Sequence, residues 1–142
     1  MANQRTPYRE IDHTADLAIE VTAPDLPTLF ASSGEALYGL IADPATIQNR
    51  DPITVTATGD GREELLHAWL CELLALFNIR GFIGKHCEIS HITDGEVMGK
   101  VTGEKLDFQR HAFRTEIKGV TYHDFKVWQE KGEWYAQVIF DV

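Results

Sequence analysis

Apolar residues recur along this chain with two different periodicities, which predict where it forms helices and where it forms strands. From Leu26 to about Ala42 they return every three or four positions, as in an amphipathic helix. Asp25 is suited to cap the start of that helix, and Asp43-Pro44 stops it. From Ile53 to Thr58 apolar and polar residues alternate strictly, which predicts a strand with one buried face.

A second helix is predicted from about Arg62 to Asn78, with Gly81 as its stop signal. Its apolar residues cover more than one face, whereas those of the first helix form a single stripe. A helix that is apolar most of the way round is buried on more than one side. We therefore expect it to lie between two sheets, or between a sheet and the first helix. The apolar residues are Leu65, Leu66, Trp69, Leu70, Leu73, Leu74, Leu76 and Phe77.

The remaining apolar runs predict antiparallel strands. Asp94-Gly95 is a strong hairpin signal between two of them. Because no repeat or linker interrupts the pattern, we expect one α+β domain over residues 1–142, with antiparallel β-sheets packed against two α-helices in layers. The predicted strands cover residues 8–11, 17–21, 83–92, 96–103, 116–122, 125–130 and 133–140.

Charge and composition narrow the possible partners. The 142 residues include 22 acidic and 13 basic ones, a net charge of −9. This balance argues against tight, direct nucleic-acid binding and is compatible with a cation or a basic partner. Cys71 and Cys87 form no CxxC pair, so we expect a reducing, cytoplasmic setting. No apolar run is long enough to span a membrane, and residues 1–7 have no apolar core of a signal peptide.

Acidic residues at two distant places are the candidates for chemistry. Asp12-His13-Thr14-Ala15-Asp16 lies between two predicted strands, and Asp141 precedes the α-carboxylate of Val142. Spacing alone leaves two readings open, namely a capped turn with a solvated strand end, or a set of metal ligands. Oxygen ligands of this kind suit Ca²⁺, Mg²⁺ or Mn²⁺ and not zinc. No P-loop, GxGxxG or GxSxG motif is present.

His67 and Cys71 are a weaker candidate pair. They are four residues apart on the second predicted helix and could share a face as soft metal ligands. No further Cys or His partner is evident, so a helix face that meets loops is the favoured interpretation.

Several motifs, in order and over nearly the whole chain, resemble those of the archease family. The first, fourth and fifth of them are specific only in combination. The motifs are Asp12-His13-Thr14-Ala15-Asp16, Trp69-Leu70-Cys71-Glu72-Leu73-Leu74, Gly103-Glu104-Lys105-Leu106-Asp107, Glu116-Ile117-Lys118-Gly119-Val120-Thr121-Tyr122-His123 and Val138-Ile139-Phe140-Asp141-Val142.

This resemblance implies an accessory protein and not a stand-alone enzyme. Archeases assist a GTP-dependent RNA ligase that joins tRNA exons and repairs RNA ends, by promoting guanylation of the ligase and its repeated turnover. The resemblance implies a divalent metal, with Ca²⁺ preferred over Mg²⁺ or Mn²⁺, held by Asp16, Asp141 and Val142. It also implies a functional role for Lys118.

Other residues of the matching motifs complete the expected site. We place Asp12, His13 and His123 on the same functional surface as Lys118. Gly119 stands where the family commonly has Ala, and Val142 stands where it often has Ile, with its α-carboxylate unchanged.

Two alternatives compete with this interpretation. One is a metal-dependent hydrolase that uses Asp16 and Asp141 with His13 or His123 as base, although no nucleophile is evident. The other is a generic chaperone or protein-modification accessory factor.

Overall fold

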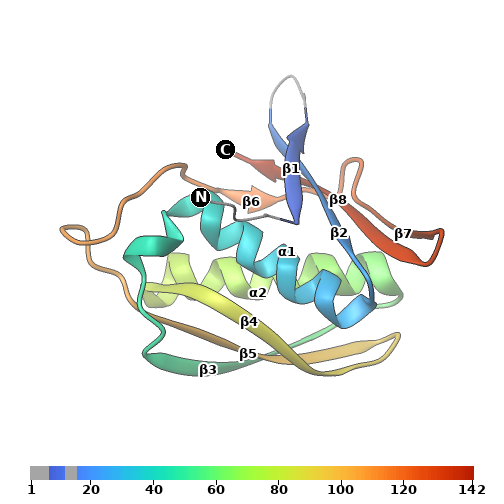
Figure 1. Ribbon diagram of the computed structural model, residues 1–142, viewed down its shortest axis with the longest axis horizontal. Coiled ribbons are helices and arrows are strands. Elements are labelled where there is room, and N and C mark those ends of the chain that lie inside the picture. The colour runs from blue at the N-terminus through green and yellow to red at the C-terminus, as the bar shows by residue number, and fades with distance from the viewer. Residues whose placement is uncertain (1–6, 12–15) are drawn as a thin grey trace.

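The described chain folds into two antiparallel sheets with two helices between them. The computed structural model describes residues 7–11 and 16–142. Figure 1 shows α1 and α2 side by side in the middle layer, one sheet above them and the other below. The predicted α+β class is therefore confirmed.

Strand β8 is the hub of the five-stranded sheet. The order is β1-β2-β8-β6, and β7 also pairs with β8. The bounds are β1 Tyr8–Ile11, β2 Leu17–Ala23, β6 Gly119–Val120, β7 Lys126–Glu130 and β8 Glu133–Asp141. The other sheet has the order β3-β5-β4, with bounds β3 Asp51–Thr58, β4 Phe82–Ile92 and β5 Glu96–Lys105.

Helix α1, Leu26–Ile41, begins and packs as its sequence requires. The Asp25 side chain accepts a hydrogen bond from the Thr28 backbone N at 2.8 Å and caps the helix. Gly34 lies where α1 meets α2, because a Cβ there would come within 2.6 Å of Leu73 Cδ1. The short 3-10 helix η1, Pro44–Thr46, follows.

Helix α2, Arg62–Arg80, is buried on both sides as predicted. It packs against β3, β4 and β5 of one sheet and against β6 and β7 of the other. Trp69 is fully buried at its centre, and its indole Nε1–H donates to Phe30 O at 3.1 Å. Gly81 ends the helix in the left-handed conformation at φ 64°, which glycine adopts without strain.

The prediction of a strand over 116–122 is wrong in extent, because only Gly119–Val120 is a strand. The segment before β6 instead forms backbone hydrogen bonds with the C-terminal ends of the two helices. Arg114 N donates to Ile41 O at 2.8 Å, and Leu106 N donates to Gly81 O at 2.8 Å. Carbonyl groups at helix C-termini lack intrahelical partners, so this irregular segment supplies some of the missing donors.

Candidate functional site

The strand register brings the two distant acidic positions together. Strands β2 and β8 are antiparallel, with Leu17 opposite Phe140. Continuing that register by one residue sets Asp16 opposite Asp141. Residues directly opposite each other in antiparallel strands have their Cβ atoms about 4.5–5.5 Å apart on one face. The C-terminal end of β8 and the start of β2 lie at the same edge of the molecule (Figure 1).

Both carboxylates belong to the outer face of the five-stranded sheet. Val138 and Phe140 are part of the core that the helices fill, whereas Ile139 is buried outside it. Side chains alternate between the two faces of a strand, so Asp141 points away from the helices with Ile139. Asp141 and Val142 are both exposed. We call Asp16, Asp141 and the Val142 carboxylate the acidic strand end.

The acidic strand end has the donor chemistry of a hard-cation site. Two side-chain carboxylates and the chain terminus supply only oxygen atoms, which suit Ca²⁺, Mg²⁺ or Mn²⁺. Neither Asp16 nor Asp141 receives a side-chain hydrogen bond or ion pair from another residue within the described ranges. Within those same ranges, no three His, Cys, Asp or Glu side chains gather closely enough to hold a metal.

Asp12 and His13 lie outside the described residues, so the structure does not place these two members of the predicted site.

Lys118 lies beside the acidic strand end through its backbone. Its N–H donates to Asp141 O at 2.7 Å, and the next residue, Gly119, pairs with Asp141. By strand alternation, the Lys118 side chain points to the face opposite that of Asp141. Lys118 is exposed and forms no ion pair within the part of the chain that the structure describes. The geometry places its amine toward solvent at the rim of the site.

His123 lies in the turn between β6 and β7. Its Nε2 is 3.2 Å from Asp124 Oδ2. This turn runs beside β8, because Gln137 Nε2 donates to Asp124 O at 2.9 Å. Gln137 is four residues before Asp141, so His123 lies further along the sheet than Lys118 does.

His67 is a residue whose role the sequence did not reveal. Its Nε2 donates to Val120 O at 2.8 Å and so ties β6 to α2. Tyr122 stacks on its ring with centroids 3.7 Å apart, and Phe125 meets the ring edge at 5.4 Å. His67 therefore fixes the position of β6, the two-residue strand that directly follows Lys118. A His on a helix gives no sequence signal for such a long-range contact.

Cys71 and His67 do lie on the same helix face, as their spacing predicted. The Cys71 Sγ atom is 3.6 Å from His67 Nδ1. Burial, followed by the nearby Glu72 carboxylate, raises the pKa of the Cys71 thiol, which therefore keeps its proton. Since His67 Nε2 is committed to Val120 O, the pair stabilises the helix–strand contact.

A third acid, Glu104, is buried and fully partnered. Its carboxylate receives two hydrogen bonds from Arg110, both 2.7 Å, and one from the Gln48 backbone N at 2.9 Å. His111 Nε2 lies 2.8 Å from Glu104 Oε2. The Arg110 hydrogen bonds, aided by His111 and Gln48, lower the pKa of Glu104 far below its ordinary value although burial opposes the shift.

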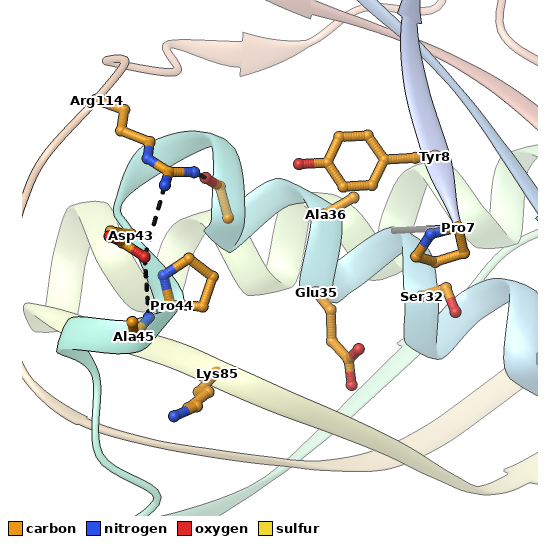
Figure 2. A pocket seen from close by; sticks show the side chains of 11 residues that line it. Pro7, Tyr8, Ser32, Glu35, Ala36, Asp43, Pro44, Ala45, Lys85 and Arg114 are labelled. Carbon is orange, nitrogen blue, oxygen red and sulfur yellow. Dashed lines mark hydrogen bonds and ion pairs between the residues drawn. The ribbon is translucent and has the colours of Figure 1, made fainter. Parts of the chain in front are cut away.

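A cavity of about 580 Å³ lies away from these residues, between α1, β1 and β4 (Figure 2). Its charged residues are partly paired with one another, since Arg114 Nη2 is 3.5 Å from Asp43 Oδ1. Glu35 accepts from Cys87 N at 2.9 Å and lies 2.8 Å from His86 Nδ1. None of the described candidate residues lines this cavity.

The fold defines a class of small proteins in which two sheets enclose two helices, and here the last strand ends at exposed acidic residues. Residues 8–142 match the model of the Archease protein family (MTH1598/TM1083). The chain belongs to the archease family.

Individual relatives cover almost the full chain. Protein archease of Methanopyrus kandleri is 37% identical, over 96% of this chain and 99% of its own length. Protein archease of Pyrococcus furiosus is 32% identical, over 95% and 98%.

Two solved structures share the fold. The solution structure of protein 1598 of Methanobacterium thermoautotrophicum has a TM-score of 0.82 at 28% identity, covering 97% of this chain and all of that one. A crystal structure from Thermotoga maritima, described as an archease and possible chaperone, has a TM-score of 0.65 at 22% identity and covers 100% of both chains.

Neither helix of the described chain combines the length and apolar character needed to cross a lipid bilayer.

Proposed function

We propose that this protein is an accessory factor that activates a GTP-dependent RNA ligase of tRNA splicing and RNA repair, promoting guanylation and repeated turnover of that ligase. One observation carries the proposal: the acidic strand end and Lys118 meet at one exposed edge, although they come from three separate segments of the chain. Membership of the archease family supports an RNA ligase as the partner. The two free cysteines are consistent with action in the reducing cytoplasm.

Asp16, Asp141 and the Val142 carboxylate would hold a divalent cation. Three carboxylates at one place repel one another, and a bound cation would offset this repulsion. The cation would supply the positive charge that lets the three groups lie close together. The chain itself supplies an ordered terminus, because β8 stays paired with β2 and β6 up to the acidic residues.

Lys118 acts toward the partner and not as a counter-ion for the carboxylates. Alternation sends its side chain to the opposite face from Asp141, and its amine is exposed. An amine held there can reach an anionic group such as a nucleotide phosphate in the ligase. The His67 bond to Val120 keeps the backbone that carries it in register with β8.

The direct test is multiple-turnover RNA ligation by the purified ligase with GTP, with and without this protein. Wild type should raise the turnover number, whereas Lys118→Ala and Asp141→Asn should not. Lys126→Ala is the matched control, because Lys126 is an exposed lysine on β7 away from the acidic strand end. All four proteins should have similar melting temperatures.

Two results would contradict the proposal. If wild type leaves ligase turnover unchanged, the activator function is wrong. If the protein alone turns over RNA or a nucleotide and Asp141→Asn stops this, the hydrolase alternative is correct.

A further inference from the structure

Two exposed phenylalanines and a partly buried one lie together at the end of the molecule where the helices terminate. The ring centroids of Phe108 and Phe113 are 5.3 Å apart, and Phe113 is 6.3 Å from Phe77 on α2. Phe108 is 79% exposed and Phe113 is 38% exposed. We call these three residues the aromatic surface. Contiguous exposed apolar surface on a soluble protein commonly marks a contact site.

The exposure of Phe108 follows from a rigid arrangement of its neighbours. Arg110 and His111, which come directly after Gln109, turn inward to the buried carboxylate of Glu104. His111 also accepts from Asp107 N through Nδ1 at 3.0 Å, which closes the turn around Phe108. The buried ion cluster thus fixes the backbone on both sides of Phe108 and leaves its ring outside.

The aromatic surface is close along the chain to Lys118, which borders the acidic strand end. Phe113 is five residues from Lys118, so at most about 18 Å of chain separates them. A standard protein interface covers roughly 800 Å² of each partner, a patch about 30 Å across. A protein partner that contacts Lys118 with an interface of that size can therefore reach Phe113.

The charge near the aromatic surface differs from that of the rest of the chain. Residues 105–118 contain four basic and two acidic residues, whereas the whole chain contains 13 and 22. The two arginines of this segment are engaged by carboxylates, Arg110 by Glu104 and Arg114 by Asp43. Their charges are therefore poorly available for phosphate groups, which favours apolar contact with a protein over binding of a nucleic acid.

We propose that the aromatic surface is a second binding site for the RNA ligase. It would fit an apolar pocket on the ligase whose rim is weakly acidic. This inference rests on the proposed function. The two parts of this interface have different roles. The aromatic surface supplies affinity, and Lys118 with the acidic strand end supplies activation. Aromatic residues dominate the energy of many interfaces, and a few anchors carry most of it.

The test measures affinity and activation separately. Calorimetry and a ligation assay compare wild type, Phe108→Ser and Ile79→Ser with the purified ligase. Ile79 is 81% exposed and is the matched control, because two residues along a helix place it about 200° from Phe77. Phe108→Ser should weaken ligase binding about 10-fold or more, with full stimulation regained at saturating protein. Ile79→Ser should match wild type in both assays.

Each other outcome overturns the inference. Equal ligase affinity of Phe108→Ser and wild type removes the anchor while leaving the proposed function intact. If Phe108→Ser instead abolishes self-association in sedimentation, the surface joins two copies of this chain. If it lowers affinity for single-stranded RNA alone, the occupant is RNA. Absence of ligase binding by wild type defeats the proposed function and this inference with it.

Discussion

Glu104 and Asp141 are both acids near the end of a strand, and their surroundings are opposite. Glu104 is 3% exposed, and two hydrogen bonds from Arg110, one from Gln48 and a close contact with His111 satisfy its oxygens. Asp141 is exposed, and no side chain in the described ranges donates to its carboxylate. A buried acid needs internal donors to be stable there, so Glu104 is structural. An exposed acid beside two others has its ligand positions open, so Asp141 is suited to bind something from outside.

The largest expected difference between the two acids is in how much the free energy of unfolding falls when each is replaced by alanine. Glu104→Ala leaves His111 and Arg110 without their common partner and should cost about 3 kcal/mol, the low end for breaking buried ion pairs. The cost stays at the low end of this range because the Arg110 side chain is 40% exposed, so water can hydrate its guanidinium once Glu104 is removed. Asp141→Ala should change the unfolding free energy by less than about 0.5 kcal/mol. Urea unfolding with a common slope measures both, and equal costs would remove the distinction.

The same contrast should appear in the pH dependence. The Arg110 hydrogen bonds hold the pKa of Glu104 below its unfolded value, so its stabilising effect is present above about pH 4–5. It is lost as the pH falls toward the folded pKa, because the unfolded chain then binds the proton first. The difference in unfolding free energy between wild type and Glu104→Gln should therefore narrow from pH 7 to pH 3. A difference that stays constant over this range would show that Glu104 gains nothing from its charge.

A smaller effect should follow from loosening β6, the strand that directly follows Lys118. His67→Phe keeps a ring for Tyr122 to stack on but removes the donor to Val120 O, which should cost about 1 kcal/mol. A loss of this size leaves the protein folded, so unfolding does not account for reduced activity. Ligase stimulation should nevertheless fall, because β6 shifts relative to β8. His67→Gln, which restores an N–H donor, should recover part of the stimulation. If His67→Phe stimulates fully at saturation, the position of Lys118 does not depend on His67.

The residues that fill the core could be predicted well from the sequence. The apolar surface of α2 extends round the helix, so its burial between two layers followed directly from the pattern. The apolar pattern over 133–140 likewise predicted a strand, which is β8 in the structure. The strand over 116–122 was overestimated because Glu116 to Lys118 alternate as strand residues do, while the chain before them bonds to helix ends.

The parts of the site that depend on contacts between distant segments were not predictable. Nothing in the spacing of Glu104, Arg110 and His111 distinguishes a buried cluster from three solvated side chains. His67 likewise reaches Val120 across 53 positions of sequence, a pairing that only the fold creates. By contrast, Asp16 and Asp141 flank strands with a strong pattern, so their convergence could be anticipated once the strands were expected to pair.

We propose that the terminal carboxylate of Val142 is itself a ligand of a divalent cation at the acidic strand end. Residues added after Val142 move the terminal carboxylate away without changing any side chain. Calorimetric titration of Ca²⁺ and Mn²⁺ should compare four proteins: an N-terminally extended form, a C-terminally extended form, Asp141→Ala, and Val142→Ile, which retains the terminal carboxylate.

The C-terminal extension should weaken cation binding about as much as Asp141→Ala does, whereas the N-terminal extension and Val142→Ile should bind like wild type. Equal affinity of the two extended forms would contradict the account and show that the Val142 carboxylate is not a ligand.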